Sequence, residues 1–200
     1  MNRKIKLFYS IFFVLIVTTL FYLGCNVPEE KKVMTHEELI ARGEYLIETT
    51  GCHDCHTPKT FGPDGMKLDE TKLLAGHPEG SQLYEIDINM VGPGKWMLTN
   101  DHLTAWVGPW GISFSSNLTP DNATGLGAVS EEMFIKTLRE GKIKGVGRQM
   151  LPPMPYEVFG KMTDEDIKAM HAYLQSIPSV SNKVNEPVPP PMVAELYGKK

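Results

Sequence analysis

Two cysteines and a histidine lie close together in the segment GCHDCH, which begins at Gly51. Their arrangement, C-x-x-C-H, is the signature of covalent haem attachment, in which each thiol adds to a haem vinyl group and the histidine binds the iron. Residues three apart lie on one side of a helical turn, so both thiols can reach one porphyrin. The segment therefore predicts one covalently attached haem c, held by Cys52, Cys55 and His56.

Two other uses of a closely spaced cysteine pair have less support. A thioredoxin-like redox pair follows a buried strand and begins a helix, whereas this pair closes a predicted helix and precedes Thr57 and Pro58. A structural zinc site needs two further ligands at short spacing, and the remaining cysteine is the distant Cys25. We therefore favour haem attachment.

A six-coordinate haem needs a second axial ligand, and the segment QMLPPMPY offers Met150 and Met154. Prolines on both sides of Met154 fix the backbone and remove competing amide donors, so a stiff loop can present the thioether. Met150 lacks this frame, and most of the 11 methionines are expected to fill the core. We predict that Met154 is the second iron ligand.

The other histidines provide further nitrogen donors. His77 and His102 are rival axial ligands, and either one would give a bis-histidine haem of lower potential. We expect His53 and His171 to face solvent, and His36 to lie in the first turn of its helix.

Three amphipathic segments predict the helices that position these residues. A capping box that starts at Thr35 opens a helix over residues 36–50. Ser130 caps a second helix, and Gly141 is placed to end it. The third helix, over residues 164–177, has the clearest pattern, because its apolar residues repeat every three or four positions.

The N-terminus has the pattern of an export signal. Positive residues precede an uncharged apolar run that continues to Leu23, and the following Gly24-Cys25 resembles the lipobox of bacterial lipoproteins. We expect residues 1–24 to be a signal peptide and Cys25 to carry the lipid anchor; an uncleaved membrane helix is the alternative. Either arrangement places the rest of the chain on the periplasmic side of the bacterial cell envelope, attached to a membrane.

The remaining segments lack a helical period. Residues 25–34 are polar and predict a tether, and residues 181–200 are rich in proline and predict an extended tail. Residues 57–127 form a long, mostly irregular insert that contains all three tryptophans, Trp96, Trp106 and Trp110. We expect these tryptophans to pack over one side of the haem and raise its potential; a surface excursion with its own small core is the alternative.

The composition limits the class of protein. The chain has 200 residues, of which 42% are hydrophobic and 22% charged, as in one ordinary globular domain. Its formal net charge is -4, and it lacks the basic surface that nucleic-acid binding requires. Nucleic acid is therefore not an expected partner.

Several segments together resemble one family. The C-x-x-C-H motif, the Pro-Met-Pro-Tyr loop and the final amphipathic helix are similar to those of class I c-type cytochromes. The resemblance is most specific to monohaem lipoprotein cytochromes and to the cytochrome subunits of periplasmic alcohol and aldehyde dehydrogenases. It rests further on residues 117–121, 124–127, 138–141 and 163–166, and it covers residues 36–186.

The resemblance implies an all-α class I cytochrome c fold over residues 35–180, interrupted by the insert. It also implies that the N-terminal and C-terminal helices cross at a small residue packed against aromatics, a role that Gly43, Tyr45 and Tyr173 could fill. The dehydrogenase subunits carry three haem motifs, whereas this chain has one, so we expect a monohaem protein rather than a multihaem relay.

The function implied is electron transfer rather than enzymatic catalysis. Imidazole and thioether ligands hold the iron in both oxidation states, so single electrons can pass quickly between docked proteins. The expected partners are a dehydrogenase, an oxidase or a quinol-oxidising complex. The alternative is a haem enzyme or ligand sensor of the peroxidase kind, in which the sixth iron position is open or can be vacated.

Overall fold

The structure is a computed structural model that describes residues 3–24 and 33–198. The chain divides into two units, one around helix α1 (Arg3–Gly24) and one that begins at Met34. Across the described ranges, no helix has both the length and the apolar character that a membrane span needs. Cys25 and most of the predicted tether, residues 25–32, lie outside the described residues.

The predicted helices are confirmed with small changes at their ends. They are α2 (His36–Thr49), α4 (Glu131–Glu140) and α6 (Asp164–Ser176). The capping box at Thr35 is formed, since its hydroxyl accepts from the Glu38 amide and the Glu38 carboxylate accepts from the Thr35 amide. Gly141 ends α4 in the left-handed conformation, with φ of 66°.

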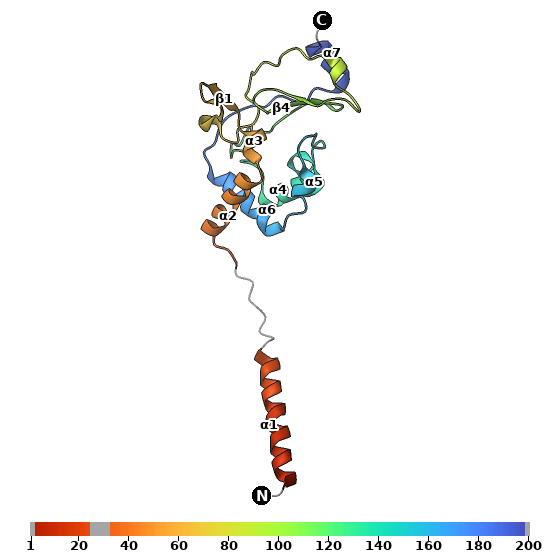
Figure 1. Ribbon diagram of the computed structural model, residues 1–200. Helices are drawn as coiled ribbons and strands as arrows, with labels where there is room; N and C mark the ends of the chain where they lie inside the picture. Colours follow the sequence, from red (N-terminus) through yellow and green to blue (C-terminus); the bar gives the residue numbers. More distant parts are fainter. Residues whose placement is uncertain (1–2, 25–32, 199–200) are drawn as a thin grey trace. The chain divides into compact units, whose positions relative to one another are not determined.

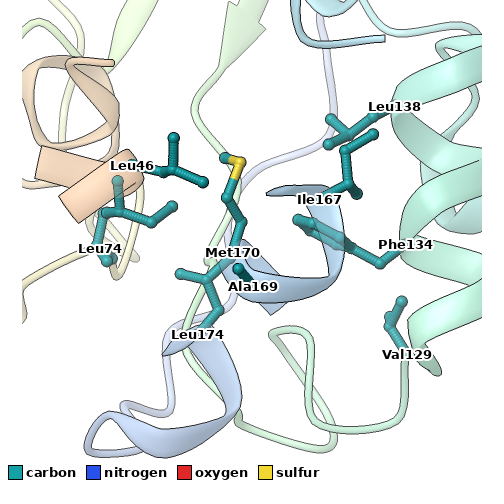
Figure 2. Packing of buried hydrophobic residues seen from close by; sticks show 10 residues of the cluster. Leu46, Leu74, Val129, Phe134, Leu138, Ile167, Ala169, Met170 and Leu174 are labelled. Carbon is teal, nitrogen blue, oxygen red and sulfur yellow. The ribbon is translucent and has the colours of Figure 1, made fainter. Parts of the chain in front are cut away.

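The first hydrophobic core lies between these three helices. Figure 2 shows Met170 and Leu174 of α6 at its centre, with Leu46 and Leu74 on one side and Phe134 on the other. The apolar faces of the helices therefore meet as their periodicity predicts. Cys52 and Met154, both half-buried, pack against this same core.

Helices α2 and α6 cross at Gly43, as the resemblance implies. Tyr173 of α6 lies at this crossing, because its Cβ atom would stand 2.7 Å from a Cβ on Gly43. Tyr45 does not share this role: its side chain is 58% exposed, and the Arg42 guanidinium lies 5.6 Å from its ring centre. The expectation for Tyr45 is therefore wrong.

The insert contains two small antiparallel sheets, so the all-α class is not confirmed. Strands β1 (Lys59–Gly62) and β2 (Gly65–Leu68) form a hairpin, with Gly62 opposite Gly65. The second sheet has the order β3-β4-β5, and its elements are β3 (Leu98–Thr99), β4 (Ala105–Gly108) and β5 (Gly111–Phe114). Short 3-10 turns occupy Glu70–Lys72 and Ile88–Met90 of the insert, and another, Ile143–Gly145, follows α4 outside it. The insert is therefore more regular than its sequence suggests.

The C-terminal tail is part of the insert lobe rather than a wholly extended strap. Val188 pairs with Ile112 of β5 through two backbone hydrogen bonds of 2.8 and 3.0 Å. Helix α7 (Pro190–Tyr197) follows and lies against β5, at the same end of the molecule as β4 (Figure 1). Buried Val193 and Ile112, together with Ile86, belong to a second hydrophobic core. The prediction of an extended tail over residues 181–200 is therefore wrong where the chain forms α7.

The three tryptophans do not form a common layer. Trp96 is 70% exposed, which contradicts its predicted packing over a haem. Trp106 is half-buried in β4 and donates a 3.2 Å hydrogen bond to the Leu103 carbonyl. Trp110 lies in the turn between β4 and β5, with its ring against Gly108. The second core agrees with the alternative of an insert that has a small core of its own.

Candidate cofactor-binding site

Both cysteines of the motif lie on one short helix, α3 (Cys52–His56). Neither forms a disulfide, and each is half-buried. Burial raises the pKa of the Cys52 thiol and of the Cys55 thiol. A redox-active pair instead has a thiolate of lowered pKa, so the environment does not favour thioredoxin-like chemistry.

The imidazole of His56 is oriented by a backbone carbonyl. Its Nδ1 lies 2.8 Å from the carbonyl oxygen of Ser116, which follows strand β5 after a short interval. A carbonyl only accepts, so Nδ1 carries the proton and Nε2 keeps its lone pair for a metal. Desolvation by burial lowers the His56 pKa, although the bond to Ser116 acts in the opposite direction. Burial therefore favours the neutral ring, and the bond to Ser116 fixes its orientation, as iron binding requires.

A buried lysine closes the end of α3. The Lys59 ammonium donates to the carbonyl of Asp54 at 2.8 Å, to that of His53 at 3.3 Å and to that of Thr57. These carbonyls carry the negative end of the helix dipole, where a cation is stabilising. Burial lowers the Lys59 pKa, while the neighbouring Cys55 and Asp54 act to raise it. Lys59 therefore fixes the backbone that presents the motif.

Two of the other histidines are held in internal contacts. His53 is only 7% exposed, and its Nδ1 lies 2.8 Å from the Thr57 hydroxyl. The Nε2 atom of His171 lies 2.9 Å from the Val129 carbonyl oxygen. The prediction that both face solvent is therefore wrong. His36 begins α2, as predicted.

The two rival ligands are engaged elsewhere in the insert. His77 is fully buried, its Nδ1 lies 2.9 Å from the Thr104 hydroxyl, and its ring tilts against Phe114. The Nδ1 atom of His102 accepts a 3.1 Å hydrogen bond from the Lys59 amide. Among the described residues, the buried Nε2 atom of His77 has no hydrogen-bond partner, so His77 stays a rival iron ligand.

The predicted methionine loop borders a pocket of about 410 Å³. Met150, Met154 and Tyr156 all line it, so the structure brings both candidate thioethers to the same place. The Met150 amide donates to the Gly141 carbonyl at 2.6 Å, which fixes that end of the loop to the end of α4. At the other end, Pro155 precedes the short helix α5 (Tyr156–Phe159).

These residues fit a haem c. Two undisulfided thiols share one helical turn, a neutral imidazole has its Nε2 free for iron, and a thioether borders a pocket. Cys52 and Met154 both pack on the first core, which supplies an apolar floor. Within the described residues, no cluster of three or more histidines, cysteines or acids could hold a separate metal ion, so the zinc alternative gains no support.

Sequence reasoning missed the residues that support the site. Lys59 is a polar residue in the insert, and Ser116 acts through its backbone oxygen. Every residue type has a backbone carbonyl, so the amino-acid sequence does not reveal which carbonyl will accept a hydrogen bond. A lysine three residues after the motif could have been suspected as a helix C-terminal cap, because cations are favoured there.

Comparison with known proteins shows which class of protein the chain resembles. No family model matches the chain. The chain is nevertheless similar, over most of its length, to cytochrome c subunits of dehydrogenases, which supports a class I c-type cytochrome and confirms the resemblance noted from the motifs.

Three relatives show this similarity. The fructose dehydrogenase cytochrome subunit of Gluconobacter japonicus is 32% identical over 80% of this chain and 26% of its own length. The alcohol dehydrogenase (quinone) cytochrome c subunit of Gluconobacter oxydans is 33% identical, over 68% of this chain and 21% of its own. The gluconate 2-dehydrogenase cytochrome c subunit of Pantoea cypripedii is 32% identical, over 69% of this chain and 23% of its own length.

The chain thus spans only about a quarter of the length of these relatives. Their names describe cytochrome subunits rather than catalytic subunits, which is consistent with electron transfer. They also suggest a cytochrome c fold and haem c.

Proposed function

We propose that this chain is a monohaem c-type cytochrome, anchored to a membrane of the bacterial envelope and facing the periplasm, that transfers single electrons between respiratory proteins. The observation that carries the proposal is the arrangement of α3, where Cys52 and Cys55 share one turn and His56 is oriented by the Ser116 carbonyl. When bound, the haem supplies a one-electron couple between Fe(II) and Fe(III).

The chain's own residues have distinct tasks in this proposal. Cys52 and Cys55 would form the thioether links, and His56 would bind iron through Nε2. Met154 would bind the iron from its loop. The first hydrophobic core excludes water from one edge of the site, which favours the oxidation state of lower charge.

The anchor and partner are parts of the same proposal. Cys25 would carry the lipid after removal of residues 1–24, and this residue lies outside the described part of the chain. The relatives are subunits of fructose, alcohol and gluconate dehydrogenases, so a dehydrogenase is the favoured electron donor. An oxidase is the corresponding electron acceptor, and a quinol-oxidising complex is an alternative donor.

The central claim, covalent attachment of one haem, is tested by asking whether the denatured protein keeps its haem. The protein, produced with the haem-attachment machinery of a bacterial periplasm, should retain its haem on a denaturing gel, with one haem per chain by pyridine haemochrome assay. The C52A/C55A double variant should lose the pigment from the gel. The matched control is Cys25→Ala, which removes the third cysteine and should keep the pigment. A wild-type chain that loses its haem on denaturation would contradict covalent attachment.

A further inference from the structure

Strand β5 is buried on both of its faces. Ile112 and Phe114 point into the second hydrophobic core, and alternate residues of a strand point to opposite faces. Ser113 therefore points away from that core, yet it is only 7% exposed. Something other than the second core must cover it.

The methionine loop provides that cover. The Ser113 hydroxyl donates a 2.6 Å hydrogen bond to the carbonyl oxygen of Pro152, two residues before Met154. The same hydroxyl accepts a 3.2 Å hydrogen bond from the indole nitrogen of Trp110. The indole N–H, the hydroxyl and the carbonyl thus form a directed chain, in which each bond polarises the next.

The composition of the loop makes this contact important. Prolines 152, 153 and 155 have no N–H group, so the backbone there can be held from outside mainly through its carbonyls. The Met154 carbonyl is already used within the loop, since it accepts from the Tyr156 amide at 3.0 Å. The Pro152 carbonyl is the acceptor that links the loop to the insert.

The same stretch of chain also orients His56. Ser116, whose carbonyl accepts from the imidazole at 2.8 Å, is three residues beyond Ser113. Between them, the Ser115 amide donates to the Thr104 carbonyl at 2.9 Å. Val188 of the tail holds Ile112 on the other edge of β5. The segment from Ser113 to Ser116 is also held at the Ser115 carbonyl, which accepts from the His77 amide at 2.9 Å.

We propose that Ser113 is a positioning residue for Met154, and that the Ser113–Ser116 segment supports both residues that would bind the haem iron, Met154 and His56. This inference rests on the proposed function, because it requires Met154 to bind the iron. It gives the insert a role as a support for the methionine loop rather than as a layer of tryptophans over the haem.

The consequence is resistance of the sixth iron position to outside ligands. Imidazole can bind ferric haem only by displacing the thioether, and displacement requires the loop to move. With the hydrogen bond from Ser113 to Pro152 intact, that movement breaks the bond. Without the bond, the loop moves at lower cost, so imidazole should bind more tightly.

The test is an imidazole titration of the oxidised holoprotein, followed by loss of the far-red band of the methionine–iron bond. Ser113→Ala should bind imidazole about two- to tenfold more tightly than wild type, the range of one net hydrogen bond. The matched control is Ser115→Ala, which removes a hydroxyl from the same segment but leaves the bond to Pro152. Its affinity should equal that of wild type.

The outcomes separate this inference from the proposed function. If the far-red band is present and Ser113→Ala binds imidazole with wild-type affinity, the positioning role is overturned while methionine ligation stands. Equal tightening in Ser113→Ala and Ser115→Ala would also overturn it, because the effect would then follow from general loosening of the strand. If the wild-type band is absent, methionine ligation fails and this inference falls with it.

Discussion

Gly43 of α2 and Ala169 of α6 meet backbone to backbone. A Cβ atom placed on Gly43 would stand 1.9 Å from the carbonyl oxygen of Ala169 and 2.6 Å from its carbonyl carbon. These are rigid backbone atoms, so a methyl group could be accepted only by moving the two helices apart. The crossing supports the first core, on which Cys52 and Met154 both pack.

Gly43→Ala should therefore destabilise the holoprotein. Overpacking costs about 1–3 kcal/mol, which exceeds the roughly 1 kcal/mol that alanine gains over glycine in a helix. Chemical denaturation followed by circular dichroism measures the change in unfolding free energy. Gly62→Ala is the control, because no atom lies within 4 Å of its added Cβ. A Gly43→Ala variant as stable as wild type would show that the helices do not touch there.

Met154 and Met150 should behave differently when each is replaced by alanine. Met154→Ala removes the thioether held between prolines, so the oxidised protein should lose the far-red band and become high-spin or bind an external ligand. Met150→Ala should keep the band. Absorption spectra of the two oxidised variants decide between them, and the reverse result would assign the ligand to Met150. A high-spin wild type would instead favour the haem enzyme or sensor.

His77 should make the fold sensitive to mild acid. Burial, with a smaller effect from the nearby His102, lowers the pKa of His77 to about 4, whereas an unfolded histidine titrates near pH 6.5. Below about pH 6.5 the unfolded chain takes up a proton that the folded chain refuses, so stability falls as the pH drops toward 4. Above pH 6.5 this contribution is absent.

The corresponding measurement compares wild type with His77→Gln at pH 7 and pH 5. Wild type should lose up to about 2 kcal/mol more unfolding free energy than the variant over this interval. Glutamine keeps a polar group near Thr104 but cannot take up the proton. Parallel losses in the two proteins would mean that His77 is protonated in the folded state.

Cys25 should carry a lipid in the mature protein. The preceding apolar run and Gly24 resemble a lipobox, so cleavage before Cys25 and diacylglyceryl modification are expected. Mass spectrometry of the N-terminal peptide from membranes of the native host gives the answer directly. An intact N-terminus at Met1 would support the uncleaved helix instead.

The local features of the fold were predictable because their signals are local. The cap at Thr35 and the left-handed stop at Gly141 depend on residues within one turn of each helix end. The two sheets were not predictable, because strands of two to four residues that include glycine show no clear alternation of apolar and polar side chains. Helix α7 had a signal in the prolines that open it, but the surrounding proline-rich sequence suggested an extended chain.

The candidate site likewise has features that the sequence predicts and features that it does not. The haem motif was visible because three reactive side chains fall at fixed spacing. The supports of its ligands were not visible, since the Ser116 oxygen and the Pro152 oxygen belong to the backbone and meet their partners across long stretches of sequence. Trp96 shows the opposite error, because a large aromatic residue suggested packing and is instead exposed.

The junction of the tail with the insert has a consequence for how the protein matures. Ile86 and Val193 share the second core although roughly a hundred residues separate them, and contacts so distant in sequence form slowly. A chain made from its N-terminus offers the thiols of α3 long before α7 exists. We therefore expect haem attachment to precede closure of the insert lobe, with the Ser116 carbonyl becoming fixed beside His56 only when the last helix docks.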